Sequence, residues 1–248
     1  MTRHLLIIGG QRCGTTYLHA LLDAHPDITM ARPARPEPKV FLSAEVIDRG
    51  RDWYRSTYFA HATNESVLGE KSTSYLEDGA AATRAAAVLG SAEIVVQLRD
   101  PVARAVSNWR FSTAHGFERR PLAEALEENL HGSRAWDRDQ SSVSPYAYLE
   151  RGRYIVYLEP WLATFAPTLH VRFLEDVVTG RETAADLYRA LGVDPAFQPP
   201  GEGNRVNRSN GPEPELDGRL LRRLRGYFAA YDARLSERLG RELLWSVS

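Results

Sequence analysis

The 248-residue chain is poor in cysteine, contains no long apolar run and carries almost no net charge. Cys13 is its one cysteine, so no internal disulfide can form and nothing requires an oxidising compartment. No apolar stretch approaches the roughly 20 residues of a membrane span. The first apolar run, residues 4–8, is too short for a signal peptide. These features favour a cytoplasmic protein without a membrane span.

Basic and acidic residues are balanced, with 31 Lys and Arg against 32 Asp and Glu. This balance argues against a nucleic-acid partner held by global positive charge, although a local basic pocket remains compatible with it. Lysine is scarce: Lys39 and Lys71 are the two lysines, and all the other residues of the Lys and Arg set are arginines. Each lysine is therefore a candidate for a position where a guanidinium will not serve, chance being the alternative.

Apolar segments alternate with amphipathic ones along the whole chain. This alternation predicts one three-layer α/β domain over residues 1–248, with a P-loop-like, mostly parallel sheet flanked by helices. Residues 29–38 and 194–214 are rich in Pro, Gly, Arg or Asn and predict loops. The expected strands are 4–8, 68–71, 93–98 and 169–173, and the expected helices are 17–24, a short one around 53–59, 78–89, 101–113, 121–130, 154–165, 182–191 and 216–239.

A glycine turn, Gly9 to Thr16, directly follows the first expected strand. Backbone N–H groups in such a turn, backed by a helix N-terminus, can cradle a phosphate-like anion. Gly9 and Gly14 have the spacing of the nucleoside-triphosphate loop G-x-x-x-x-G-K-[ST], but Thr15 replaces its lysine and Arg12 lies inside the loop. The turn therefore predicts a ligand with a shorter 5′ anion, the alternative being a turn without a ligand. No G-x-G-x-x-G dinucleotide motif is present.

A second group of polar residues follows the strand 93–98: Arg99 and Asp100 precede Pro101, and Arg104 and Ser107 lie on the next helix. Ligands of open α/β sheets bind at the carboxyl ends of strands, where Arg99 stands. Its guanidinium can hold a phosphate with two hydrogen bonds, and Ser107 can donate a hydroxyl beside it. Alternatively, Asp100 is only a helix cap and Arg104 forms a salt bridge.

Residues 7–16 and 94–108 resemble the two cofactor signatures of sulfotransferases that use 3′-phosphoadenosine 5′-phosphosulfate (PAPS). The resemblance implies that Arg99 and Ser107 hold the 3′-phosphate. It implies that the 5′-phosphosulfate is held by the loop residues Gln11, Arg12, Cys13, Gly14, Thr15 and Thr16.

Three further segments resemble the heparan sulfate N- and 3-O-sulfotransferase-like group and its bacterial relatives. Residues 37–41 resemble the K-E-x-H-F-F element, whose glutamate, here Glu37, is the general base of the family. Residues 70–75 resemble E-K-T-P-x-Y, whose lysine, here Lys71, serves catalysis. Residues 224–245 resemble the terminal helix and its G-x-x-x-x-W ending. The implied activity is transfer of a sulfuryl group from PAPS to a hydroxyl or amine of a carbohydrate or small-molecule acceptor.

The sequence departs from this family at several positions. Arg12 replaces the usual lysine of the phosphosulfate loop, Pro36 stands where lysine is frequent, and Lys39 stands where histidine is frequent. The late K-G-R cofactor loop is not recognisable, and Arg208 is the candidate substitute, with Arg205 as the other possibility.

The catalytic chemistry expected of these residues is simple. Glu37 deprotonates the acceptor, and Lys71 and Arg12 neutralise charge on the leaving oxygen. No metal is needed, and the seven histidines show no ligand spacing. A P-loop kinase and a non-catalytic nucleotide- or glycan-binding module are the rival interpretations, and the acceptor and the oligomeric state stay open.

Two other patterns have plain explanations. The arginine run on the last helix could bind an acidic glycan but is typical of a solvated helix face: Arg219, Arg222, Arg223 and Arg225. Five aromatic residues could line an acceptor cleft but are more typical of a core: Trp53, Tyr54, Tyr58, Tyr75 and Trp109.

Overall fold

The computed structural model describes residues 2–137, 144–200 and 214–245. Within it the chain forms two compact units. The first comprises Met1–Leu98 with Leu158–Asn207, and the second comprises Arg99–Tyr157 with Arg208–Ser248. Each unit is described by itself below.

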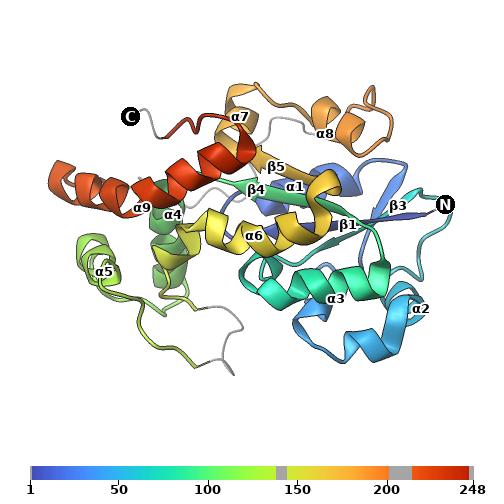
Figure 1. The fold of residues 1–248 in the computed structure, drawn as a ribbon, viewed down its shortest axis with the longest axis horizontal. Coiled ribbons are helices and arrows are strands. Elements are labelled where there is room, and N and C mark those ends of the chain that lie inside the picture. The colour runs from blue at the N-terminus through green and yellow to red at the C-terminus, as the bar shows by residue number, and fades with distance from the viewer. Residues whose placement is uncertain (1, 138–143, 201–213, 246–248) are drawn as a thin grey trace. The chain divides into compact units, whose positions relative to one another are not determined.

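The first unit contains a five-stranded sheet in the order β2-β3-β1-β4-β5, and every neighbouring pair of strands is parallel (Figure 1). The α/β fold class predicted from the sequence is therefore confirmed. Because the strands are parallel, their carboxyl ends meet at one edge, with the end of β1 beside the ends of β3 and β4. The strands are β1 (Arg3–Gly9), β2 (Ile28–Met30), β3 (Val67–Lys71), β4 (Glu93–Leu98) and β5 (Leu169–Phe173).

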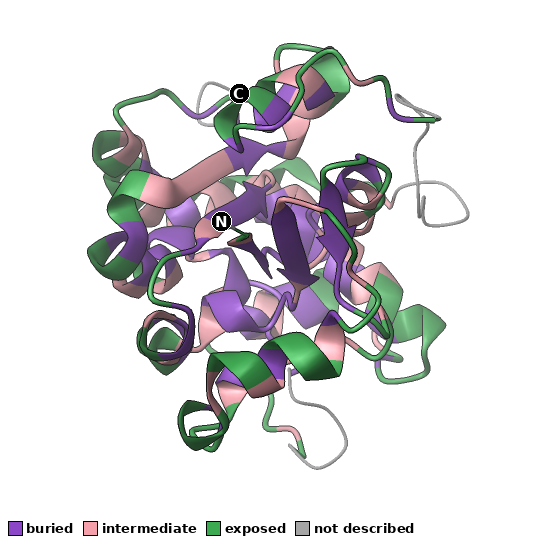
Figure 2. Ribbon diagram, turned by 90° about the vertical axis from the view of Figure 1, so that its right-hand side faces the viewer, coloured by how far each residue is buried: buried purple, intermediate pink, exposed green. Residues whose placement is uncertain are grey.

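The central strands are buried on both faces (Figure 2). Leu5 and Ile7 of β1 join one apolar cluster with side chains of α1 and α8, while Leu6 and Ile8 alternate to the other face and are equally inaccessible. This double burial is the reason that the strands read as continuous apolar runs. The helices of this unit are α1 (Thr15–Asp23), α2 (Val46–Tyr58), α3 (Gly79–Leu89), α7 (Leu174–Thr179), α8 (Ala184–Ala190) and most of α6 (Tyr154–Phe165).

The second unit is helical and has its own apolar core, built mainly from α4 (Pro101–Ala114), α5 (Leu122–Asn129) and α9 (Gly218–Leu239). Asp100 caps α4 by accepting a hydrogen bond from the Val102 amide, so the interpretation of Asp100 as a helix cap is confirmed. The same carboxylate is bonded to Arg225 at 2.6 and 2.8 Å.

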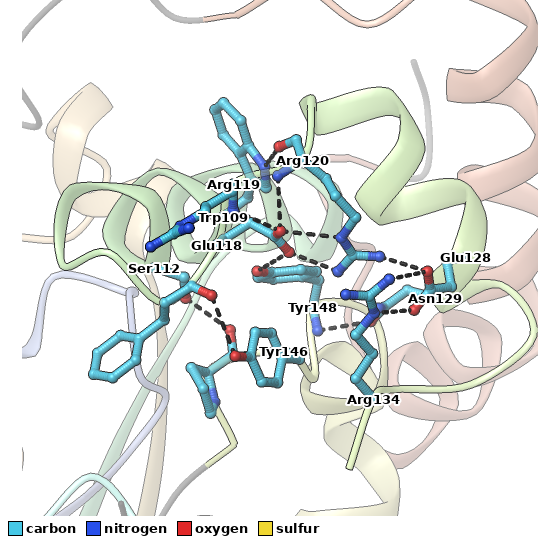
Figure 3. Close-up of polar contacts among 12 residues, drawn as sticks. Trp109, Ser112, Glu118, Arg119, Arg120, Glu128, Asn129, Arg134, Tyr146 and Tyr148 are labelled. Carbon is cyan, nitrogen blue, oxygen red and sulfur yellow. Dashed lines mark hydrogen bonds and ion pairs between the residues drawn. The ribbon is translucent and has the colours of Figure 1, made fainter. Parts of the chain in front are cut away.

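A buried carboxylate organises one side of the second unit (Figure 3). Glu118 accepts hydrogen bonds from the Arg120 guanidinium at 2.6 and 3.0 Å, from the Arg119 and Arg120 amides at 2.9 Å, and from the Tyr148 hydroxyl at 3.0 Å. Burial raises the pKa of Glu118, but the bonds from Arg120 and the others outweigh it and lower the pKa to about 2. The network therefore stabilises the unit through a carboxylate that stays ionised.

One short strand and one short α-helix were not predicted from the sequence. β2 overlaps the start of the predicted loop 29–38, and α7 follows β5 without a break. Three strand residues and six helical residues are too few to show a period of 2.0 or 3.6. In the part of the chain described here, every helix is too short or too polar to traverse a bilayer.

Candidate active site

The glycine turn between β1 and α1 forms a loop at the carboxyl edge of the sheet. Gly9 and Gly14 have φ values of 151° and 83°, and Arg12 also has a positive φ of 68°. A Cβ on Gly14 would lie 2.8 Å from the Gln97 amide nitrogen, so both the conformation and the packing require glycine there. Gly14 is the N-cap of α1: its carbonyl accepts from the Tyr17 and Leu18 amides at 3.0 and 3.2 Å, but without a side chain it cannot accept from the amides of Thr15 or Thr16.

Two hydrogen bonds to Gln97 of β4 hold this loop in its conformation. The Gly10 amide donates to the Gln97 carbonyl at 2.7 Å, and the Gln97 side chain donates to the Cys13 carbonyl at 2.6 Å. The loop is thus bonded to the strand at both ends before any ligand is considered. Such preorganised amides at an uncapped helix N-terminus are suited to an anion.

Glu37 and Lys71 lie together, as the predicted catalytic pair requires. Lys71 Nζ donates to Glu37 Oε1 at 2.5 Å, and the two side chains are 12% and 18% exposed for Lys71 and Glu37, respectively. Thr73 holds the other carboxylate oxygen, with its amide at 2.9 Å and its hydroxyl at 3.1 Å. Glu37 therefore has a fixed orientation and still reaches solvent.

The pair is adjacent to the glycine turn. Lys71 is the last residue of β3 and pairs in register with Ile7 of β1, two residues before Gly9. A Cβ on Gly9 would lie 3.3 Å from the carbonyl oxygen of Thr73. The structure therefore brings the turn, the carboxylate and the ammonium group to one edge of the first unit.

Glu70, one residue before Lys71, is fully buried. Consecutive strand residues point to opposite faces, so Glu70 enters the core while Lys71 does not. Three hydroxyl groups, those of Ser72, Tyr75 and Tyr54, donate to Glu70 at 2.6, 2.6 and 2.7 Å. Burial raises the pKa of Glu70, and the three hydrogen bonds oppose that shift.

The remaining cofactor candidates lie in the second unit. Arg99 directly follows β4, and its carbonyl accepts a hydrogen bond from the Tyr154 hydroxyl at 2.8 Å. Ser107 lies on α4 and is partly exposed. Arg104 is 1% exposed, and its guanidinium donates to the Tyr148 carbonyl and to the Asn108 side chain. Arg208 lies outside the described residues.

Several residues near the pair were missed by the sequence reasoning. Thr73 lies within the quoted motif, but only Lys71 was assigned a role there. His19 on α1 was passed over among the histidines. Burial lowers its pKa, and the charges of Lys71 and Glu37 also act on it, so it lies within electrostatic reach of the pair. Spacing along the chain cannot reveal such a neighbour, because α1 and β3 are far apart in sequence.

The core explanation is confirmed for two of the five aromatic residues, whereas the arginine run on α9 is a solvated face only at Arg219 and Arg222. Tyr54 and Tyr75 are fully buried, so both belong to the core. Arg223 is paired with Glu127, and Arg225 is paired with Asp100, so half of the arginine run on α9 has intramolecular partners.

A parallel sheet with a glycine turn after its central strand defines the chain as a P-loop-like α/β protein. Residues 5–65 match the sulfotransferase family. The structure is similar throughout its length to that of a sulfotransferase from Alicyclobacillus acidocaldarius, with a TM-score of 0.75, 24% identity and 100% of both chains covered.

Two curated relatives sharpen the comparison. The bifunctional heparan sulfate N-deacetylase/N-sulfotransferase 1 of Mus musculus is 29% identical over 95% of this chain and 29% of its own length. The heparan sulfate glucosamine 3-O-sulfotransferase 3B1 of Mus musculus is 24% identical over 97% of this chain and 64% of its own length. The chain thus spans less than a third of the first relative. These matches confirm the predicted resemblance to sulfotransferases of the heparan sulfate N- and 3-O-sulfotransferase-like group.

Proposed function

We propose that this protein transfers a sulfuryl group from PAPS to a hydroxyl or amine of a carbohydrate or small-molecule acceptor. The observation that carries the proposal is the Glu37–Lys71 pair beside the glycine turn. A nucleotide-binding module without turnover needs the turn but has no use for a carboxylate and an ammonium group at its edge.

The residues of the turn fit the 5′ end of such a donor. Gly9 and Gly14 let the chain turn tightly against Thr73 and Gln97, and α1 begins directly after the turn, where a helix N-terminus favours an anion. Arg12 adds a positive charge within the loop. Arg99 and Ser107 are the proposed ligands of the 3′-phosphate in the second unit, with Arg208 as a further candidate.

The donor supplies a sulfuryl group that passes in line to the attacking oxygen or nitrogen, in the manner of phosphoryl transfer. Glu37 accepts the proton of the attacking group. Lys71 and Arg12 offset the negative charge that grows on the departing phosphate oxygen. Thr73 keeps the Glu37 carboxylate in place while Lys71 changes partners from that carboxylate to the departing oxygen.

The donor site is tested by thermal unfolding with adenosine 3′,5′-bisphosphate (PAP), ATP or ADP. A ligand at about 100 times its dissociation constant adds ~2.7 kcal/mol of stability, which corresponds to roughly 5–10 °C for a chain of this size. We expect this shift with PAP. Stabilisation by ATP but not by PAP would contradict the proposal and favour the kinase interpretation.

The transfer is tested with ³⁵S-labelled PAPS and acceptors of two kinds. The names of the relatives suggest glucosamine-containing oligosaccharides, one with free amino groups and one with N-acetyl groups. A panel of phenols and small alcohols covers the other class. Label transferred to any of them supports the proposal, and transfer to the oligosaccharide with free amino groups alone would show that the acceptor must carry a free amine.

A further inference from the structure

The motif residue Glu70 has no role in the chemistry above, although it is the most deeply buried carboxylate of the first unit. We propose that Glu70 is a positioning residue for Glu37, because it orients two hydroxyl groups that anchor the segment following Glu37. This inference rests on the proposed function, in which Glu37 is the base.

The first step concerns the hydroxyl protons. Ser72 and Tyr75 each donate their single hydroxyl proton to Glu70 Oε1. Their oxygen lone pairs are then left for other donors. Tyr54 donates to Oε2 in the same way, which completes three hydrogen bonds to a carboxyl group without contact to solvent.

The second step concerns what the two hydroxyls receive. Ser72 Oγ accepts from the Lys39 amide at 2.9 Å, and the Tyr75 hydroxyl accepts from the Phe41 amide at 3.1 Å. Lys39 has a φ of 53°, a conformation that residues other than glycine rarely adopt. The bond to its amide therefore holds a backbone that would otherwise relax.

The third step concerns Glu37 itself. Residues 37–41 are attached to residues 71–75 at four points, which are Glu37 to Lys71, Glu37 to Thr73, Lys39 to Ser72 and Phe41 to Tyr75. Glu70 controls the last two of these. The carboxylate of a base must stay close to its productive place, since a displacement of about 1 Å can cost ~10²-fold in rate.

The chain offers a matched pair of variants. Tyr75→Phe and Tyr54→Phe each remove one phenol hydroxyl from a fully buried side chain, and each deletes one hydrogen bond to Glu70. Only Tyr75 also accepts from the segment after Glu37. We expect both variants to lose thermal stability because both leave the carboxylate with one donor fewer, and Tyr75→Phe to lose more because the buried Phe41 amide also loses its acceptor.

Their effects on transfer should differ. Tyr75→Phe should lower kcat by about tenfold with an unchanged KM for PAPS and unchanged PAP affinity, because the displaced base acts only in the chemical step. Tyr54→Phe should keep kcat within about twofold, as expected when no transition-state contact is lost. Hydrogen exchange of the Phe41 amide should accelerate in Tyr75→Phe alone.

The outcomes separate the hypotheses. Equal kcat values in the two variants, or equal exchange at Phe41, would overturn the positioning role and leave Glu70 as a structural carboxylate. If Tyr75→Phe does not fold, Ser72→Ala tests the other anchor through exchange of the Lys39 amide. If the wild-type protein binds no PAP and transfers no label, the proposed function fails, whereas the exchange data still report whether the hydroxyls anchor residues 37–41.

Discussion

Replacing Glu37 by glutamine tests the catalytic assignment most directly. Gln keeps the shape of the side chain and one oxygen that can accept from the Thr73 amide, now at 2.9 Å from the carboxylate. It cannot take up a proton, and it loses the charge that pairs with Lys71. General-base assistance contributes about 10²–10⁴-fold in rate, so kcat should fall at least ~100-fold. The KM for PAPS and the PAP affinity should change little.

The stability cost of this change follows from the pair itself. The 2.5 Å bond joins side chains that are 12% and 18% exposed, so it is neither a surface ion pair nor a fully buried one. Losing a hydrogen bond between charged groups in this setting costs about 1–2 kcal/mol, which is roughly 2–8 °C in melting temperature. The variant should therefore remain folded at assay temperature.

The assay needs a control that loses a comparable carboxylate elsewhere. Glu93 is also 18% exposed and bonds His170 at 2.9 Å, but it begins β4 and thus lies at the opposite end of the parallel strands. Glu93→Gln should retain wild-type turnover. The pH profile adds a second measure, since the acid limb of kcat should disappear in Glu37→Gln. More than about a tenth of wild-type activity in Glu37→Gln, above the expected range, would refute Glu37 as the base.

Three further predictions address Lys71, Arg99 and the buried carboxyl group of Asp232 in the second unit. Lys71→Arg should preserve the bond to Glu37 and the melting temperature. It should lower kcat at least ~10-fold, because a planar guanidinium cannot approach a single oxygen in the way that a compact ammonium group does. A wild-type kcat in this variant would exclude a specific role for the ammonium group. Arg99→Ala should raise the KM for PAPS and the Kd of PAP far more than it lowers saturated kcat. Arg119→Ala, which removes an exposed arginine, is the control. A large fall in kcat with an unchanged KM for PAPS would show that Arg99 does not hold the 3′-phosphate. Burial raises the pKa of Asp232 from 3.8 to about 6, so the folded protein holds a proton that the unfolded chain releases, and stability should fall as the pH rises from about 4 to 6. Asp232→Asn still accepts a hydrogen bond from the Trp245 indole. It should remove the loss of stability with rising pH and raise the melting temperature at pH 8 by roughly 2–8 °C. A melting temperature below that of the wild type at pH 8 would contradict this prediction.

Much of the fold could be predicted because the sheet is buried on both faces. The segments 93–98 and 169–173 are apolar runs between turn residues, and the structure has strands with those same bounds. The helix 154–165 was also predicted with its observed limits, despite Pro160. β2 was not predicted, because a three-residue edge strand owes its existence to its bonds with β3 rather than to its own pattern.

The candidate site was predictable only as a set of residue types. The glycine turn, Glu37 and Lys71 could be named from their motifs, but the partners of Glu37 depend on the packing of residues 37–41 against 71–75. In sequence, the cationic residues nearest to Glu37 are Arg35 and Lys39. The structure instead pairs Glu37 with Lys71, 34 residues away, and fixes Lys39 through its backbone. Such long-range pairing has no signature in local sequence.

Cys13 is a chemical reporter within the glycine turn, Gly9 to Thr16. It is the one cysteine of the chain, its side chain is fully buried, and its Sγ lies 3.6 Å from the Gln11 carbonyl oxygen. An alkylating reagent can reach this thiol only when the loop opens, so the rate of alkylation measures the free energy of that local opening. A ligand that holds the loop shut lowers the labelling rate in proportion to the fraction of protein left without ligand, by roughly 100-fold at 100 times its dissociation constant. Ligands of the loop can therefore be ranked by thiol labelling before any acceptor has been found.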